Sequence, residues 1–478
     1  MVGTSMIIGA CGGGDDPKPA STRTESTGQF VQDGVFDAKV RGAWRVLGEG
    51  RFLEIGERGL TQFEEARSIC YVDRREALPI EIVRDYNYRR VEESDRVTVD
   101  IHLDGNPSAM TLERIPEVPH HCRQEPPTDP ATVFKTMWEI FDLDYGFFKE
   151  RHIDWAARFA SLQQKAAAAA NDDALQAVLT EALHDFNDYH VTLYRYKGDE
   201  SIDALGTFLG TGNTPTMQML RQAFAQQSEI LSLDDFDAQW KERMRASMRP
   251  HLIPQGGTHA LNDSMVWGTL PGNIGYVQLS RLAGFVEEDS PAADLKAIRA
   301  EMDKVIAALA DTKAIILDIA VNDGGYDEFS AEVAGRFADR RRLAFTVQQH
   351  RPQGNKGEAW YVEPKGERQY LKPVYVLTTD RTVSAGDSLT LMMRELPHVI
   401  HIGQRTSGSM SDRLVKALPG NFGVGLSNES YFDARGILYE GRGIPPKVGL
   451  QVFYPSDPAS LYTGHEAAIG KIIHMIGG

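Results

Sequence analysis

A serine lies where a buried strand gives way to a helix, in the stretch Thr382–Asp387 (TVSAGD). The preceding run Val374–Leu377 is β-branched and aromatic, and the following residues repeat at helical spacing (Leu389, Met392, Met393 and Leu396). Such a turn exposes the Ser384 hydroxyl beside the first N–H groups of the helix. Those groups would stabilise the oxyanion formed when serine attacks a carbonyl, so the pattern suits a nucleophile. It also suits a helix-capping serine, and Thr382 stands where a G-x-S-x-G elbow has its first glycine.

A nucleophilic serine needs a base, an acid that orients the base, and N–H donors for the oxyanion. The candidate base is His190, in a polar turn between a helix and a strand, with a pKa suited to proton transfer near neutrality. The candidate acid is Glu440, in a glycine-rich loop. The candidate oxyanion donors are Gly324 and Gly325, at a strand end, together with the N–H of Ala385. Each of these residues taken alone also fits a purely structural role.

Composition limits the classes of function. The chain has 478 residues, enough for about three domains, with a hydrophobic fraction of 42% and a charged fraction of 25%, as in ordinary soluble proteins. The net charge of −16 argues against a nucleic-acid partner, because phosphate binding needs a basic surface. No apolar run reaches the ~18 residues of a membrane-spanning helix.

The N-terminal sequence is similar to a bacterial lipoprotein cleavage site, with Ile8–Cys11 (IGAC) followed by glycines and acids. Residues 1–10 are short and carry no Lys or Arg, so we interpret them as the remnant of a signal peptide. This interpretation predicts lipid attachment at Cys11 and a place in the bacterial cell envelope, facing the periplasm. In that oxidising compartment Cys70 and Cys122 could pair, although two cysteines permit a disulfide without demonstrating it.

Pattern changes along the chain divide it into four segments. Residues 1–28 are predicted as a flexible tether, and residues 29–125 as a β-rich module with period-two strands. Residues 129–265 are predicted as a helical region that carries the candidate base, and residues 266–478 as the α/β catalytic core. We interpret the sequence HHC at 120–122 as linker and predict no metal site. We find no pattern of a PDZ module, and the sequence indicates no oligomeric state.

The segment from about 374 to 450 resembles the tail-specific and tricorn-core serine peptidases. The serine turn is similar to their T-x-S-A-G-E motif, with Asp387 in place of Glu. Further similar motifs follow in the family's order: IGQRTSG at 402–408, LPGN at 418–421, LSNE at 426–429 and YEGRGIPP at 439–446. Upstream, LDI at 317–319 with NDGG at 322–325, and NDYHVTL at 187–193, are also similar to family motifs, so the resemblance covers roughly residues 130–450.

The family uses two catalytic layouts. The Ser–Lys layout places a lysine after the TSG-like loop, but here Gly408 is followed by Ser409 and Met410. The tricorn-like layout of Ser, His and Glu is matched by Ser384, His190 and Glu440. The chain departs from the family pattern elsewhere: Tyr189 replaces a serine before the histidine, Lys447 replaces an aspartate, and Asp318 lacks its following arginine.

The resemblance implies an α/β fold: a crotonase-like (Clp-protease-like) αββ core with an added helical region and the N-terminal β-rich module. It implies a serine peptidase that acts on peptides or unfolded proteins without a metal or organic cofactor. Two alternatives stay open. One is a non-catalytic envelope binding protein on the same fold. The other is an α/β-hydrolase esterase, although its order Ser, acid, His differs from the order His, Ser, Glu found here.

Overall fold

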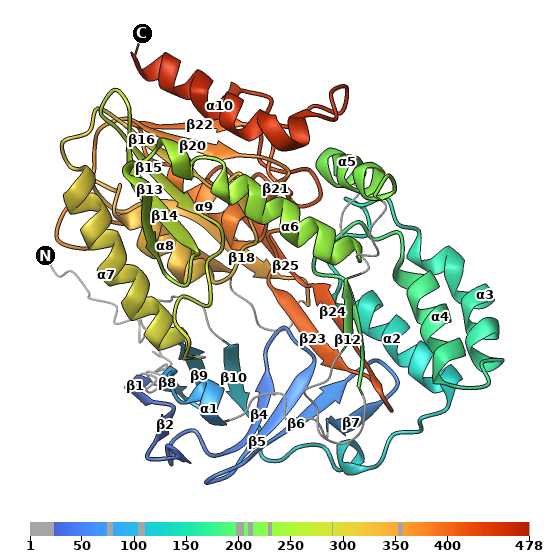
Figure 1. Cartoon of the computed structure of the whole chain (residues 1–478). Helices are drawn as coiled ribbons and strands as arrows, with labels where there is room; N and C mark the ends of the chain where they lie inside the picture. Colours follow the sequence, from blue (N-terminus) through green and yellow to red (C-terminus); the bar gives the residue numbers. More distant parts are fainter. Residues whose placement is uncertain are drawn as a thin grey trace, which may run out of the picture.

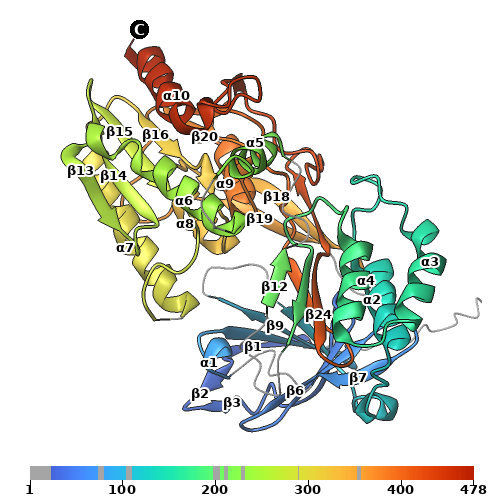
Figure 2. The ribbon, with the colours of Figure 1, turned by 45° about the vertical axis from the view of Figure 1, so that its right-hand side comes forward.

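The computed structural model describes residues 23–73, 80–103, 110–196, 205–208, 214–227, 232–288, 290–351 and 357–477. A central sheet with helices on both faces forms the upper part of Figure 1. An antiparallel sheet from the first 114 residues lies below it, and a group of helices lies to the right. Smaller sheets lie between these parts, as the turned view in Figure 2 shows.

The central sheet has seven strands, and its order follows the chain. They are β13 (Ile253–Ala260), β14 (Met265–Leu270), β15 (Ile274–Leu279), β16 (Ile315–Asp318), β20 (Val374–Thr378), β22 (Val399–Gly403) and β26 (Val448–Gly449). The first three strands are antiparallel, and from β15 onward all neighbours are parallel. Both faces are buried, which explains the nearly continuous apolar sequences of β15 and β16.

Helices cover both faces of this sheet. On one face lie α7 (Pro291–Leu309), α8 (Asp327–Gly335) and α9 (Ala385–Arg394); on the other lie α5 (Pro215–Phe224), α6 (Leu233–Ala246) and α10 (Ser460–Gly477). In β16, Ile315 and Leu317 pack with the first group and Ile316 packs with the second. The 3₁₀ helix η2 (Arg249–His251) leads into β13, and the short strands β17 (Val321–Asn322) and β21 (Arg381–Thr382) pair beyond the ends of β16 and β20.

Two smaller sheets connect the core to the rest of the chain. One contains β18 (Arg342–Gln349), β19 (Glu358–Val362) and β25 (Glu429–Asp433). The other contains β11 (Thr192–Arg195), β12 (Leu205–Phe208), β23 (Arg413–Ala417) and β24 (Phe422–Ser427). Helices α2 (Pro130–Asp144), α3 (Trp155–Ala167) and α4 (Asp172–Leu183) pack through aromatic and aliphatic side chains against β24. This packing holds the segment after α4 close to the core.

The N-terminal part is an eight-stranded antiparallel sheet. Its strands are β1 (Arg23–Gln29), β4 (Gly42–Val46), β5 (Arg51–Ile55), β6 (Leu60–Glu65), β7 (Cys70–Asp73), β8 (Asn87–Glu93), β9 (Arg96–His102) and β10 (Met110–Arg114). The pair β2 (Val31–Gln32) and β3 (Val35–Phe36), helix α1 (Ile80–Val83) and the 3₁₀ helix η1 (His120–Arg123) complete it. A disulfide joins Cys70 in β7 to Cys122 in η1, the pairing that the sequence left open.

The predicted α/β class with an N-terminal β-rich module is confirmed. Residues 23–28, which we expected in the flexible tether, instead belong to β1, because their backbone pairs with β8 along the edge of the sheet. The other domain limits stay predictions. Cys11 lies outside the described residues, so its lipid attachment also stays a prediction. Within the described ranges, no helix has both the length and the apolar character needed to cross a membrane.

A buried cluster of charges fixes the N-terminal module to the hairpin of β23 and β24. The Lys416 ammonium lies 2.8 Å from the Glu64 carboxylate, and both side chains are fully buried. The same ammonium donates hydrogen bonds to the carbonyls of Glu49 and Gly50, each at 2.7 Å. Arg51 pairs with Glu64 at 3.0 Å from the other side. Because these charged groups are buried away from water, the loss of any one partner would leave an uncompensated charge and destabilise the fold.

Replacing Lys416→Met should therefore destabilise the protein strongly, by about 3–5 kcal/mol, because Glu64 and two carbonyls lose a donor in a dry site. Urea unfolding followed by circular dichroism would measure the change. Lys165→Met is the matched control, since Lys165 pairs with Glu181 while about half exposed and should cost less than about 1 kcal/mol. Equal unfolding midpoints for the two variants would contradict this account.

Candidate active site

Ser384 sits in a backbone conformation that few side chains adopt. It lies between β21 and α9 with φ 58° and ψ −121°, and its side chain does not cap the helix. A non-glycine residue at positive φ costs about 1–2 kcal/mol, so the surrounding contacts must hold it there. One such contact is the hydrogen bond from the Ser384 N–H to the Ser409 carbonyl at 3.0 Å. The Ser384 side chain thus does not take the capping role that the sequence left open, and its hydroxyl has no hydrogen-bond partner among the described residues.

Gly324 lies against this serine, and Gly325 lines the same cavity as Ser384. A Cβ on Gly324 would come within 2.6 Å of the Ser384 Cβ, so only glycine leaves room for the serine. The Gly324 N–H donates to Asn322 Oδ1 at 2.9 Å. By contrast, the N–H groups of Gly325 and Ala385 have no hydrogen-bond partner among the described residues. Two free backbone donors next to a strained serine are what an oxyanion site requires.

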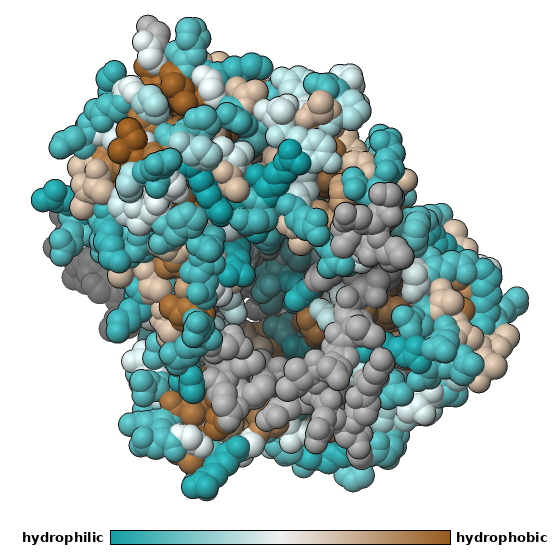
Figure 3. All heavy atoms as spheres, in the orientation of Figure 1, coloured by the Kyte–Doolittle hydropathy of each residue, from teal (hydrophilic) through white to brown (hydrophobic). Residues whose placement is uncertain are grey.

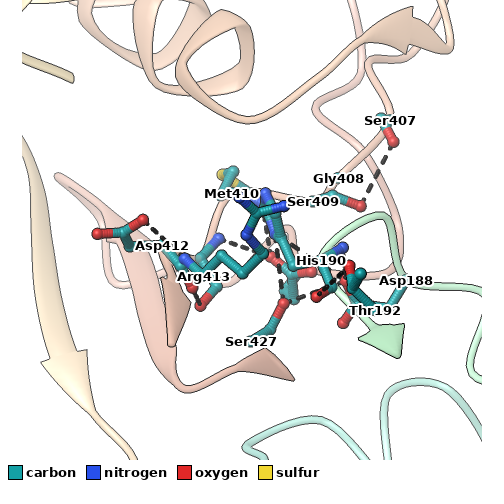
Figure 4. Close-up of polar contacts among 12 residues, drawn as sticks. Asp188, His190, Thr192, Ser407, Gly408, Ser409, Met410, Asp412, Arg413 and Ser427 are labelled. Carbon is teal, nitrogen blue, oxygen red and sulfur yellow. Dashed lines mark hydrogen bonds and ion pairs between the residues drawn. The ribbon is translucent and has the colours of Figure 1, made fainter. Parts of the chain in front are cut away.

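His190 is oriented by a short chain of hydrogen bonds. Its Nδ1 lies 3.4 Å from Ser427 Oγ, which in turn donates to Asp188 Oδ1 at 3.1 Å, and His190 Nδ1 lies 4.0 Å from the same oxygen. Since Ser427 gives its only proton to Asp188, it must accept from His190 Nδ1–H. This arrangement leaves Nε2 as an acceptor, which is the tautomer that a general base needs. Figure 4 draws these groups together with the 409–413 segment.

Burial and charge set the protonation of this histidine. Burial lowers the pKa of His190, and the neighbouring Asp188 carboxylate only partly opposes that effect. The imidazole is therefore neutral near pH 7 and can accept a proton. Burial would raise the pKa of Asp188, but Arg151 and His190 hold it below its usual range. Asp188 thus carries the negative charge that would stabilise a protonated imidazole.

Glu440 shares a buried arginine with Asp188. Arg151 Nη2 lies 2.5 Å from Glu440 Oε1, and Arg151 Nε lies 3.3 Å from Asp188 Oδ2. Glu440 also accepts hydrogen bonds from the N–H groups of Met410 at 2.8 Å and Ser411 at 3.3 Å. Burial raises the pKa of Glu440 to about 8, and the charge of Asp188 adds to this effect. Glu440 thus fixes the segment whose Ser409 carbonyl accepts from Ser384.

Tyr189, which departs from the family pattern, has a definite contact. Its hydroxyl accepts a hydrogen bond from Arg381 Nη1 at 3.0 Å, and Arg381 forms two further bonds to Asp237 of α6 at 2.8 and 2.7 Å. Arg381 lies three residues before Ser384. The tyrosine therefore ties the turn that carries His190 to the turn that carries the nucleophile.

Asp387 joins the start of α9 to the loop that follows β22. It is fully buried and accepts from the Gly408 N–H at 3.1 Å. Burial raises its pKa to about 7. The shorter aspartate thus reaches the TSG-like loop from the position where the family motif has glutamate.

A second Ser–His–Asp alignment lies beneath α10. His465 Nδ1 is 2.8 Å from Ser247 Oγ, and His465 Nε2 is 2.8 Å from Asp318 Oδ2. The Ser247 hydroxyl, however, donates to the Met244 carbonyl at 2.8 Å, at the C-terminal end of α6. A helix C-terminus disfavours nearby negative charge, so this place is unfavourable for an oxyanion on a substrate carbonyl. We assign the cluster to anchoring α10 on the sheet.

Ser384 opens into a cavity of about 740 Å³ between the core and the N-terminal module. Figure 3 shows the molecule hollowed between these two parts, with hydrophilic residues on the floor. The cavity is lined by Gly325 and Ser384 on the core side, and by residues of β5, β8, β9 and β10 on the other. A substrate could reach the serine from this space.

The structure thus brings Ser384 together with Gly324, Gly325 and Ala385, and His190 together with Asp188. Among the described residues, no hydrogen bond joins Ser384 to His190, and none joins His190 to Glu440. Sequence reasoning missed Arg151, Asp188 and Ser427. The last two lie within motifs that resemble the family (NDYHVTL and LSNE), whereas no pattern singled out Arg151.

Comparison with known families agrees with this geometry. Residues 273–450 match peptidase family S41, and residues 126–184 match the tricorn protease C1 domain. Residues 273–450 are a peptidase family S41 domain. The S41 domain contains the Ser384 turn, both glycines and Glu440, whereas His190 follows the tricorn C1 match. These matches place the chain's similarity to the C-terminal processing peptidases in its S41 domain and in the helical segment before His190.

Individual relatives are distant. The carboxy-terminal processing protease CtpA of Bacillus subtilis (strain 168) is 26% identical over 140 residues, which cover 29% of this chain and 29% of CtpA. A candidate peptidase from Parabacteroides merdae ATCC 43184 superposes with a TM-score of 0.53 at 20% identity, covering 73% of this chain and 98% of that one. A serine-to-alanine mutant of CPAF superposes with a TM-score of 0.50 at 12% identity, with the same coverage. The two structures share the fold.

Gly324→Ala should displace Ser384, because the new Cβ would lie 2.6 Å from the serine Cβ and 2.9 Å from the Val383 carbonyl oxygen. We expect labelling of Ser384 by a fluorophosphonate to slow by roughly 100-fold or more, the size of effect that misplacing a reacting group produces. Gly436→Ala is the control: its φ of +78° resembles the +80° of Gly324, but its Cβ would meet nothing within 4 Å. Equal labelling of both variants would contradict the packing argument.

Proposed function

We propose that this protein is a serine peptidase that hydrolyses peptide bonds through an acyl-enzyme on Ser384. One observation carries the proposal: a serine held at positive φ opens into a cavity, and the nearby N–H groups of Gly325 and Ala385 have no partner among the described residues. The S41 domain match supports the same activity. Because the chain spans less than a third of the length of CtpA, the activity and substrates remain part of the proposal.

In the proposed reaction, His190 Nε2 removes the Ser384 proton as Oγ attacks the peptide carbonyl carbon. The carbonyl oxygen becomes an oxyanion and accepts from the N–H groups of Gly325 and Ala385, while Gly324 keeps the serine in place. Collapse of the intermediate breaks the C–N bond, and the leaving amine takes the proton from His190. Water, deprotonated by the same histidine, then releases the acid from Ser384. The residues require no metal or organic cofactor for these steps.

The proposal includes the formation of a hydrogen bond between the Ser384 hydroxyl and His190 when substrate binds. Such catalytic hydrogen bonds are often long in substrate-free enzymes. We propose Glu440 as the orienting acid, acting with Asp188 through their shared Arg151. The hydrogen bonds of Glu440 to the 410–411 backbone support a second effect, in which it positions the segment that holds Ser384. We also place the protein in the bacterial cell envelope, which the Cys70–Cys122 disulfide supports.

Fluorophosphonate labelling tests the nucleophile. Wild-type protein should label at one serine and cleave members of a mixed peptide library, and Ser384→Ala should lose both properties. Ser247→Ala is the matched control, because Ser247 also contacts a histidine but should keep labelling and cleavage intact. Peptide mapping by mass spectrometry would identify the labelled residue. Unlabelled, inactive wild-type protein would overturn the peptidase proposal and favour a binding protein.

The pH profile of kcat/KM distinguishes the two acids. The acidic limb should lie below the usual histidine value of 6.5, because burial lowers the pKa of His190. Asp188→Asn removes a charge that raises this pKa, so its acidic limb should move to still lower pH as the rate falls. Glu440→Gln should lower kcat by roughly 10²–10⁴-fold, with little movement of that limb. Movement of the limb in Glu440→Gln alone would instead make Glu440 the direct partner of His190.

A further inference from the structure

The cavity beside Ser384 gathers carboxylates from several elements. Its acidic lining at the core side comes from the start of α8, the end of the 409–412 segment and the first residues of β19 and β25 (Asp327, Asp412, Glu358 and Glu429). Glu328 of α8 also lines the cavity, as do Glu49, Glu93 and Asp100 of the N-terminal module. The cationic side chains of the lining (Arg23, Arg89 and Arg96) lie on β1, β8 and β9, where each pairs with an acid of its own sheet. The core side of the cavity is therefore lined by carboxyl groups, with the cationic side chains on the opposite side.

Glu429 is the least compensated member of this group. Its backbone N–H donates to Ser411 Oγ at 3.0 Å, but its carboxyl group has no hydrogen-bond donor and no counter-ion among the described residues. Burial raises its pKa well above the usual range, and Asp412, Glu49, Glu358 and Asp327 add to the rise. Glu429 is half-buried and lines the cavity, so its carboxyl group is placed to meet a cationic group that enters there.

The acidic group is hydrogen-bonded to the two segments that hold the nucleophile. Asp327 accepts a hydrogen bond from Ser388 at 2.5 Å, and Ser388 lies one helical turn after Ser384. The Ser384 N–H donates to Ser409, three residues before Asp412. Glu429 contacts Ser411 in the same segment. Because Ser384 lines the same cavity, a group bound by these carboxylates would lie in the space onto which the nucleophile opens.

Aromatic side chains line the approach to the carboxylates. Trp360 and Tyr431 both line the cavity and pack against the buried Phe345, with ring centroids 5.6 and 5.3 Å away. The Tyr431 hydroxyl also donates to Asp327 at 2.9 Å. Apolar walls that end in carboxylates match a long aliphatic side chain with a cationic tip, as in lysine and arginine.

We propose that this cavity selects peptide substrates with a Lys or Arg side chain next to the scissile bond, and that Glu429 and Asp412 bind its charge. This inference rests on the proposed peptidase function. When the peptide binds, the charged end of its Lys or Arg side chain exchanges its water for these carboxylates. Glu429 then gains the partner that it lacks among the described residues. A divalent cation held by the same carboxylates is the competing occupant, and the experiment separates the two.

The test compares otherwise identical peptides that carry lysine, arginine or norleucine, which keeps the lysine stem without its charge. For wild-type protein treated with EDTA, kcat/KM should favour lysine or arginine over norleucine by about tenfold or more. Glu429→Gln and Asp412→Asn should each reduce this ratio several-fold. Asp412 is exposed, so its variant keeps the test valid if Glu429→Gln fails to fold. Taking the ratio within each variant cancels a general loss of activity.

Glu181→Gln is the control, since it removes the same charge from the exposed surface of α4 and should leave the ratio unchanged. Wild-type protein that labels at Ser384 but cleaves norleucine peptides equally well would overturn the inference and leave the peptidase proposal standing. A preference that appears only with added calcium or magnesium would replace it with a metal site. Absence of both labelling and cleavage would remove the peptidase proposal itself.

Discussion

One guanidinium group holds the active-site region together. Arg151, only 5% exposed, lies between Asp188 and Glu440, so a single positive charge serves two buried carboxylates. Its further hydrogen bonds to the carbonyls of Asn187 and Gly408 join the turn before His190 to the loop beside Ser384. Three segments far apart in the chain are thereby fixed to one another. Burial raises the pKa of both acids, but Arg151 and His190 outweigh it at Asp188, whereas at Glu440 burial together with the Asp188 charge outweighs Arg151.

This arrangement matters because the nucleophile cannot hold its own conformation. A serine at positive φ relaxes unless its neighbours prevent it. The Ser409 carbonyl accepts its N–H, Glu440 fixes the next two residues, and Gly324 leaves just enough room on the other side. The strain at Ser384 is thus maintained by the same ion cluster that orients the histidine. Base and nucleophile share their support even though their side chains are not in contact.

The sequence predicted those parts of the fold that local patterns determine. The strand Ile274–Leu279, the helix after Ser290 and the serine turn follow from apolar periodicity and capping residues, and each lies where expected. The segment 23–28 was misassigned because its polar residues form a strand only through pairing with β8. At the site, Gly324 packs against Ser384, but its N–H, which we expected to bind the oxyanion, donates to Asn322 instead. The roles of Arg151 and Ser427 depend on contacts across more than 200 residues, which no local pattern encodes.

The contacts of Tyr189 and Asp387 explain two departures from the family pattern. Tyr189 stands where a serine was expected, and its hydroxyl accepts a hydrogen bond from Arg381. Because Arg381 also binds Asp237, this bond links the histidine turn to helix α6 and to the strand that ends near Ser384. A serine hydroxyl at that position would be too short to make the same bridge. Asp387 compensates for its shorter side chain by accepting from the backbone of Gly408. In both cases a side chain of different length preserves the spacing between backbone segments. Catalysis of this kind depends on that spacing more than on the identity of the supporting residue.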